Sequence, residues 1–429
     1  MGPLTRVAAA LERRAGAVAG AVGAAVLVAG LLYAALLGPG LRFPDEGEYL
    51  RLAGNLAAGA GYSLDGVHPT AFRPPGYPAL LAPVVALGGG AVAARALNYV
   101  LLAGALGIVF LVLRRAGHRL AAALAPALVA AYPVIFYTAG TLYPQTLALF
   151  GVALLVLLLA PPRRSIGAGA GAGLLAGGLA LSVPTLVFLI PVAVGWLALR
   201  AERGRRLVIA AACLAAGLAP IGAWAARNEA ALGAPVPLST NSGYNLLLGN
   251  ADRTTPNAGV NADVRREIAP AAPLDEVARD DYLRGRAVAW VTEHPGRAAR
   301  LYALKVLNHF NYRNDLRTGA RASALADLVV GLTYGLLLAV VLVRLAFVRR
   351  RPLSSLEGLL LASYLLAALA TAVAFTRIRF RAPFDPLLAM LAALAVEAAL
   401  EARIRGGAPP RDAVDGEPAG PAAAVPPPP

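Results

Sequence analysis

Residues 16–37 read GAVAGAVGAAVLVAGLLYAALL and carry no charged side chain, and Arg13 and Arg14 lie just before them, separated by Ala15. An α-helix needs about 20 apolar residues to cross the hydrocarbon core of a bilayer. The basic start resembles a secretory signal peptide, but no convincing cleavage site closes the run near residues 33–40. We therefore expect a retained transmembrane helix.

Similar apolar runs recur along the chain, which has 429 residues, of which 58% are hydrophobic and only 15% charged. This excess of apolar residues over the needs of a soluble domain predicts an all-α polytopic membrane protein. We expect about ten transmembrane helices, with an uncertainty of about two. The candidate spans are residues 16–37, 92–113, 119–137, 141–160, 166–182, 184–199, 207–226, 325–348, 356–374 and 383–400.

The net charge of +15 comes almost entirely from arginine, in clusters between the spans. Because these clusters punctuate apolar runs and form no continuous stripe, they do not indicate nucleic-acid binding. Alternating the spans through the bilayer puts the clusters on one side, which the positive-inside rule identifies as the cytoplasm. Both termini are then cytoplasmic, and the expected location is the inner membrane. The clusters are residues 13–14, 114–119, 163–164, 200–206, 349–351 and 403–405.

Three segments should face outward, namely residues 38–91, residues 227–324 and the turn 375–382. The first two are too long to be simple turns. We treat residues 1–400 as one transmembrane domain that includes these outer segments. Residues 401–429 are rich in proline, alanine and glycine, which predicts a disordered cytoplasmic tail.

Shorter helices are expected within the outer segments. Residues 274–293 and 297–310 have helical periodicity, with a break at Pro295 and Gly296. Residues 76–88 are apolar but too short to span comfortably, so we place them in the interface of the outer leaflet.

Residues 43–49, FPDEGEY, bring carboxylates to the expected outer surface just after the first span. A carboxylate there can act as a general base that takes a proton from an attacking hydroxyl. The alternative is a solvated helix N-terminus, where the helix dipole favours acids. Asp45 is our candidate base, and Glu46 would orient the acceptor or the sugar.

Residues 375–383, FTRIRFRAP, carry three arginines on the side where arginine should be scarce. In an extended segment, Arg377, Arg379 and Arg381 would project to one side and bind a phosphate through charge-assisted hydrogen bonds. Arg73, in the proline-rich stretch 68–78, is a further candidate ligand. Contact with lipid headgroups alone is the alternative in both places.

Other motifs give little indication of chemistry. The four histidines lack the close helical spacing of a zinc site, and Cys213 is the single cysteine. The glycines between residues 167 and 177 lie in an apolar span with no strand before them, so we interpret them as helix packing and not as a nucleotide loop. No cofactor is predicted, and a divalent metal stays open without a ligand set to support it.

The chain resembles bacterial members of the GT-C superfamily, the polyprenyl-phosphate-sugar-dependent glycosyltransferases that include relatives of protein O-mannosyltransferases and of the lipid A aminoarabinose transferase. The resemblance covers most of residues 41–400. It rests on the order and placement of short motifs: Asp45-Glu46 with Tyr49, Arg73 to Pro78, Trp224 with Arg227-Asn228, Ser239-Thr240-Asn241 with Gly243-Tyr244-Asn245, Gly249-Asn250, Trp290 with His294-Pro295, Lys305, and Arg379 to Pro386.

In this superfamily the first outer loop supplies the catalytic aspartate, which by position implies Asp45. Outward-facing basic residues bind the lipid phosphate, which implies Arg73, Lys305 and the arginines of residues 377–381. One position departs from the pattern, since related chains often carry an acid near the outer end of the helix that starts around residue 141, and this sequence has Gln145. A metal site built on paired acids is therefore not supported.

These observations predict an inverting glycosyltransferase, moving a hexose or pentose from a polyprenyl-phosphate donor to a lipid, glycan or protein acceptor on the outer membrane face. Chemistry on that face has no access to cytoplasmic nucleotide sugars, so a membrane-borne donor is expected. Membrane lipids are the other expected partners. The alternatives are a transporter or flippase of a lipid-linked sugar, with the charged residues lining a pathway, and a structural or assembly role.

Overall fold

The computed structural model describes residues 3–161, 165–313 and 324–406. Within these ranges the regular structure is helical, apart from an isolated bridge between Ser63 and Pro69. The α-helices are α1 (Pro3–Arg13), α2 (Ala15–Leu37), α3 (Pro44–Ala57), α4 (Gly76–Ala86), α5 (Ala91–Arg115), α6 (Arg119–Ala130), α7 (Pro133–Ala139), α8 (Gln145–Leu159), α9 (Ile166–Ala180), α10 (Leu189–Arg200), α11 (Arg206–Leu232), α12 (Ser242–Gly249), α13 (Arg265–Ile268), α14 (Glu276–Glu293), α15 (Pro295–Asn308), α16 (Ala324–Ala346), α17 (Ser355–Ala372), α18 (Ile378–Arg381) and α19 (Asp385–Gly406). Three 3₁₀ turns complete the described elements: η1 (Pro184–Phe188), η2 (Gly259–Asn261) and η3 (Ala269–Ala271).

Local sequence signals set several helix ends. Ser354 and Glu357 form a reciprocal capping box at the start of α17, in which the Ser354 Oγ accepts from the Glu357 N–H and the Glu357 carboxylate accepts from the Ser354 N–H. The Asp275 side chain caps α14 by accepting from the Ala278 N–H. Helix α11 ends at Leu232 and is followed by Gly233, whose φ of 70° lies in the left-handed region that glycine adopts without strain.

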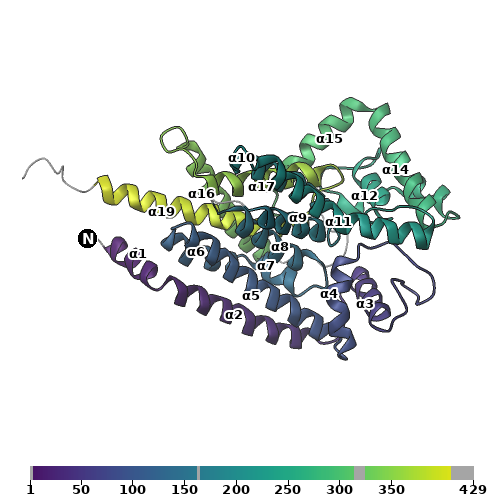
Figure 1. Cartoon of the computed structure of the whole chain (residues 1–429), viewed down its shortest axis with the longest axis horizontal. Helices are drawn as coiled ribbons and strands as arrows, with labels where there is room; N and C mark the ends of the chain where they lie inside the picture. Colours follow the sequence, from purple (N-terminus) through teal and green to yellow (C-terminus); the bar gives the residue numbers. More distant parts are fainter. Residues whose placement is uncertain (1–2, 162–164, 314–323, 407–429) are drawn as a thin grey trace, which may run out of the picture.

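The helices separate into a bundle and an end region (Figure 1). Helices α2, α5, α6 and α19 run along the long axis of the molecule, and α1 and the last turns of α19 lie at one end. Helices α12, α14 and α15 gather toward the opposite end, and α3 lies near that end as well. The two predicted helices of the second outer segment are confirmed as α14 and α15, with the break at His294.

Five described helices are long and apolar enough to cross a membrane, namely α2, α5, α11, α16 and α17. Helices α6 and α7 form a sixth candidate if they are counted as one span, bent by 63°. The other predicted spans contain shorter helices or, for residues 383–400, the helix α19. The fold is therefore that of a helical membrane protein, while a total of ten spans stays a prediction.

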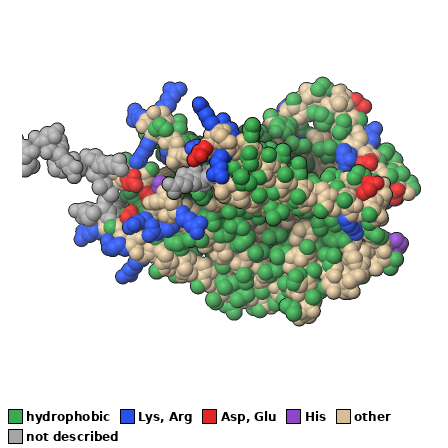
Figure 2. Space-filling model, viewed as in Figure 1, with side chains coloured by type: hydrophobic (Ala, Val, Ile, Leu, Met, Phe, Trp, Pro, Cys, Tyr) green, Lys and Arg blue, Asp and Glu red, His purple; other side chains and the backbone are tan. Residues whose placement is uncertain are grey.

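Side-chain chemistry varies along the molecule (Figure 2). Hydrophobic side chains cover the middle of the face shown, and a dense group of basic side chains, all arginine, occupies the end where α1 and the last turns of α19 lie. Helix α19 continues to Gly406, so residues 401–406 are helical and do not belong to a disordered tail. The ion pair between Arg351 and Glu401 helps to hold this end of the helix. Residues 407–429 of the predicted tail lie outside the described residues.

Helices α9 and α11 pack closely through glycine. A Cβ atom placed on Gly173 would collide with the Cys213 carbonyl oxygen, and one placed on Gly177 would collide with the Gly217 carbonyl oxygen. These contacts confirm the packing interpretation for Gly173 and Gly177, because such close backbone approach is open only to glycine, and Gly169 lies close to the Ile209 carbonyl oxygen in the same way. Gly167 and Gly171 do not take part, since an added Cβ would meet no atom within 4 Å there.

Replacing Gly173 by alanine should therefore lower the thermal midpoint of the protein in detergent. The added methyl group forces the two helices apart, and overpacking of this kind costs about 1–3 kcal/mol. Gly178→Ala is the matched control, since its new Cβ meets no atom within 4 Å. Equal midpoints for the two variants would show that the α9–α11 contact tolerates a wider spacing.

Candidate functional site

Helix α3 begins with Pro44 at its first turn, and Glu46 caps it. One Glu46 carboxylate oxygen accepts from the backbone N–H groups of Arg42 (2.6 Å) and Phe43 (3.3 Å), and the other accepts from the Leu142 N–H (2.9 Å). The side chain is fully buried. Glu46 thus ties the start of α3 to the segment before α8, and it lies with both oxygens occupied by backbone donors.

A buried arginine that the sequence analysis did not single out supports this corner. Arg95 of α5 donates to the carbonyl oxygens of Gly38 and Gly40, at 2.6 Å each, and its guanidinium lies 3.8 Å from Glu46. These bonds fix the chain between α2 and α3. The available signal was a lone charge near the start of an apolar run, which is rare in membrane helices without a partner.

Asp45 faces away from this corner and belongs to a group of four charged residues, which we call the Asp45 cluster: Asp45, Glu48, Arg73 and Arg379. The Arg73 guanidinium lies 2.9 Å from an Asp45 oxygen and 2.7 Å from a Glu48 oxygen. The Arg379 guanidinium lies 3.9 Å from the other Asp45 oxygen. Side-chain exposure in the cluster ranges from 14% for Arg73 to 33% for Arg379, so the charges are partly shielded yet reachable.

Aromatic rings hold both guanidinium groups of the cluster. Arg73 lies 5.5 Å from the ring centre of Tyr49, and Arg379 lies 5.0 Å from that of Tyr143. Phe72 and Phe380 each give a further ring contact, also at 5.0 Å. Cation–π contacts of this kind favour the charged arginine and restrict its orientation.

Electrostatics in the cluster favour the charged form of Arg73. Burial acts to lower its pKa, but the Tyr49, Asp45 and Glu48 side chains beside it outweigh that effect, and the net shift is upward. The cluster therefore keeps a positive charge on Arg73 between Asp45 and Glu48.

Two residues from the second outer segment hold the loop that carries Arg73 through hydrogen bonds. Glu276 of α14 accepts from the Thr70 hydroxyl (2.6 Å), the Ala71 N–H (2.8 Å) and the Thr240 hydroxyl (2.5 Å). Arg227 of α11 donates to the carbonyl oxygens of Thr70 (2.8 Å) and Tyr62 (3.1 Å). Arg227 and Thr240 belong to the motifs quoted above, whereas Glu276 was missed.

The turn after α17 sends its three arginines in different directions. The predicted extended segment is wrong, because residues 378–381 form the helical turn α18. Arg377 donates to the Ala258 carbonyl oxygen (2.8 Å), and only Arg379 reaches the Asp45 cluster. Arg381 is fully buried and pairs with Asp385 at 3.0 Å.

Arg381 has further partners inside the bundle. It donates to the carbonyl oxygens of His309 (2.9 Å) and Asn311 (2.6 Å) and to the Tyr132 hydroxyl (2.9 Å). Its guanidinium also stacks 3.7 Å from the ring centre of Tyr334. These contacts make Arg381 a connection among helices from both halves of the chain.

Lys305 of α15 is likewise buried and bonded within the protein. Its ammonium donates to the carbonyl oxygens of Gly249 (2.9 Å) and Ala374 (2.8 Å) and to the Asn250 side chain (3.3 Å). Burial lowers the pKa of Lys305 to about 8. It joins α12 and α15 to the end of α17.

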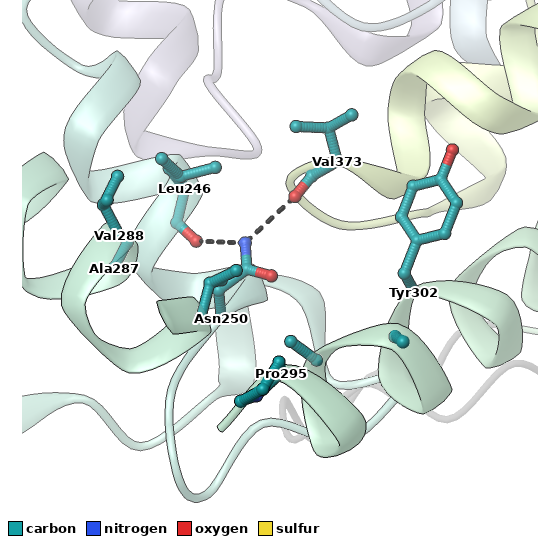
Figure 3. Close-up of a pocket in the computed structure, with 10 residues that line it drawn as sticks. Leu246, Asn250, Ala287, Val288, Pro295, Tyr302 and Val373 are labelled. Carbon is teal, nitrogen blue, oxygen red and sulfur yellow. Dashed lines mark hydrogen bonds between the residues drawn. The ribbon is translucent and has the colours of Figure 1, made fainter. Parts of the chain in front are cut away.

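A groove of about 500 Å³ lies beside Lys305, between α12, α14, α15 and the end of α17 (Figure 3). Its lining is mostly apolar, and it includes no residue of the Asp45 cluster. Asn250 projects between Leu246 and Val373 and donates to both of their carbonyl oxygens, at 2.8 and 2.9 Å. The amide is thus satisfied by the walls of the groove.

The side chains do not fit a metal site built on paired acids. Asp45 and Glu48 both face arginine, and Gln145 is a buried amide where related chains often carry an acid. In the described ranges, no three His, Cys, Asp or Glu side chains gather as metal ligands would.

No protein-family model matches the chain, and no curated protein matches it. Solved structures of an archaeal oligosaccharyltransferase are among those that resemble it. The crystal structure of the Archaeoglobus fulgidus oligosaccharyltransferase in the apo form gives a TM-score of 0.53 at 17% identity, covering 90% of this chain and 51% of that chain. The oligosaccharyltransferase AglB from the same organism, in complex with an inhibitory peptide and a dolichol-phosphate, gives 0.49 at 16% identity, covering 91% and 52%.

The chain thus spans about half the length of the oligosaccharyltransferase. At this level of identity the likeness is one of fold alone. The chain is similar in fold, over nine-tenths of its length, to an archaeal oligosaccharyltransferase.

Proposed function

We propose that this protein is a membrane glycosyltransferase that moves a sugar from a polyprenyl-phosphate donor to an acceptor on the outer face of the cytoplasmic membrane, with inversion at the anomeric carbon. The observation that carries the proposal is the Asp45 cluster. Asp45, Arg73 and Arg379 come from three distant segments of the chain and meet at one partly exposed place. A fold shared with an oligosaccharyltransferase is compatible with this class of reaction.

The reaction proceeds by direct displacement. An acceptor hydroxyl or amine attacks the anomeric carbon, the bond from that carbon to the phosphate oxygen breaks, and polyprenyl phosphate leaves. Asp45 takes the proton of the acceptor as the new bond forms. Arg73 and Arg379 stabilise the negative charge that builds on the departing phosphate.

The other predicted residues take supporting roles in this proposal. Glu46 caps α3 and sets the position of Asp45, which precedes it in the chain. Arg377, Arg381 and Lys305 donate to backbone or side-chain groups of the protein and hold the turn that carries Arg379. The phosphate site is thus assigned to Arg73 and Arg379 alone.

The proposal is tested with the purified protein in detergent and a small panel of polyprenyl-phosphate sugars. We expect a new glycosidic bond from at least one member of the panel and none from water-soluble nucleotide sugars. Turnover of nucleotide sugars alone would contradict the donor assignment. In proteoliposomes, movement of the sugar lipid without a new bond would identify a flippase instead.

Arg379→Gln should raise the donor concentration needed for half-maximal turnover by roughly tenfold, because one of two charge-assisted contacts to the phosphate is lost. The protein should stay folded, since Arg379 is one-third exposed. Steady-state kinetics over a range of donor concentrations gives the result. Arg265→Gln is the control, because Arg265 is almost fully exposed and pairs only with Asp263 among the described ion pairs. If Arg379→Gln needs the same donor concentration for half-maximal turnover as the parent, Arg379 does not bind the donor phosphate, and the turn 375–382 contacts lipid headgroups only.

A further inference from the structure

The two carboxylates of the Asp45 cluster hold Arg73 in different ways. A single Glu48 oxygen accepts from both the Nε and the Nη2 of Arg73, each at 2.7 Å. Asp45 contacts Nη2 alone, at 2.9 Å, and reaches Arg379 at 3.9 Å. Glu48 is therefore the firmer partner of Arg73, and Asp45 bridges the two arginines more loosely.

In this arrangement, the proposed role of Asp45 as a base conflicts with the proposed role of Arg73 and Arg379 as phosphate ligands. The Asp45 oxygens face the guanidinium groups of Arg73 and Arg379, so they are not directed at an acceptor hydroxyl while these contacts last. The same guanidinium groups have their charge partly neutralised and their donors partly used, so they bind an incoming phosphate less well. Asp45 can act as a base, and the arginines as phosphate ligands, only after the pair between them has been broken.

We propose that the donor phosphate replaces Asp45 on Arg73 and Arg379, and that Glu48 is a positioning residue that keeps Arg73 in place during the exchange. This inference rests on the proposed function. The phosphate brings its own negative charge to the arginines, so the charge balance of the cluster is kept while the Asp45 carboxylate becomes available to the acceptor. Donor binding then has to precede activation of the acceptor.

The surroundings of the cluster fit such an exchange. Asp45 and Arg379 are 26% and 33% exposed, so a ligand can reach both. The contacts of Arg73 with the rings of Tyr49 and Phe72 do not depend on Asp45 and would persist after it leaves. Glu46 caps the first turn of α3, which carries Asp45. The backbone at Asp45 can therefore stay in place while the Asp45 side chain rotates.

The test measures the affinity of farnesyl phosphate for the full-length protein in detergent, by calorimetric titration. Asp45→Asn should bind farnesyl phosphate roughly fivefold more tightly than the parent, because a competing partly shielded ion pair has been removed. Glu48→Gln should bind it roughly fivefold more weakly, because Arg73 loses the partner that positions it. Asp281→Asn, which removes an exposed carboxylate paired with Arg284, should bind as the parent does.

The two variants are expected to change the affinity for farnesyl phosphate in opposite directions, whereas a general loss of negative charge would make both bind it more tightly. If both Asp45→Asn and Glu48→Gln bind more tightly, removal of negative charge explains the data and Glu48 has no positioning role. If Asp45→Asn binds no more tightly than the parent, the exchange is overturned. The thermal midpoint of each variant shows whether it is folded. We expect midpoints close to that of the parent, because neither carboxylate is deeply buried.

Kinetics give a second readout for Glu48. A positioning role predicts a higher KM for the donor in Glu48→Gln with kcat close to that of the parent, whereas general damage to the structure would lower kcat as well. A fall in kcat with an unchanged donor KM would overturn the assignment of Glu48.

Failure of the proposed function looks different. The proposed function requires that the parent bind farnesyl phosphate at least about ten times more tightly than farnesol or inorganic phosphate, because both the chain and the phosphate belong to the donor. If no protein in the series shows this preference, the donor assignment and the exchange both fail. If the preference is present but Asp45→Asn is not tighter, the exchange alone fails.

Discussion

Asp45→Asn should lower turnover by roughly two or more orders of magnitude, since asparagine keeps the size of the side chain but cannot accept the proton of the acceptor. Initial rates at saturating donor and acceptor give the result. The protein should remain folded, because the residue that caps α3 is Glu46 and Asp45 lies partly exposed.

A role in helix capping would give a different outcome. Asparagine caps helices about as well as aspartate, so a purely structural Asp45 would leave both the rate and the thermal midpoint nearly unchanged. Glu46→Gln is the informative comparison. It should lower the thermal midpoint, because the Glu46 carboxylate accepts from three backbone N–H groups, and the surviving folded protein should keep most of its rate. If the loss of rate followed Glu46 and not Asp45, the base would be Glu46.

Arg381→Gln should prevent most of the protein from folding. The change removes one member of a fully buried ion pair and leaves Asp385 without its guanidinium partner, which costs about 3–5 kcal/mol. The carbonyl oxygens of His309 and Asn311 lose their donors as well. Size-exclusion chromatography and the thermal midpoint after detergent extraction measure the loss.

Removing both charges tests the cause. Arg381→Met combined with Asp385→Leu leaves no unpaired buried charge, so this double variant should recover part of the folded yield that Arg381→Gln loses. Should Arg381→Gln instead fold as the parent does and weaken donor use as strongly as Arg379→Gln, Arg381 would contact the donor phosphate directly.

The helical frame is predictable from the sequence because a long apolar run has few other solutions in a membrane protein. Each predicted span overlaps helical structure, and residues 16–37 lie within α2. Boundaries are harder to predict. Residues 141–144 precede α8 and are not part of it, because the Leu142 N–H bonds to Glu46 and Pro144 stands directly before the first turn. Such long-range hydrogen bonds leave no periodic signal in the sequence.

The Asp45 cluster was predictable in part. Asp45, Arg73 and Arg379 are each charges set beside apolar or proline-rich stretches on the expected outer side, which is unusual enough to draw attention. Arg381 is buried and does not reach the cluster, because it pairs with Asp385, four residues later. That spacing puts the two side chains together only if the turn is helical, and the alternating arginines favoured an extended segment instead.

The hydrogen bonds from Glu276 and Arg227 to the Arg73 loop have a consequence for the synthesis of the protein. Thr70 and its partner Glu276 are separated by 206 residues, and Arg379 is synthesised about a hundred residues after Glu276. During translation the first half of the chain can enter the membrane long before the groups that fix the loop exist. A ribosome-bound or prematurely terminated chain would therefore carry Asp45 without Arg379 beside it. In the proposed mechanism, such a chain would lack one of its two phosphate ligands.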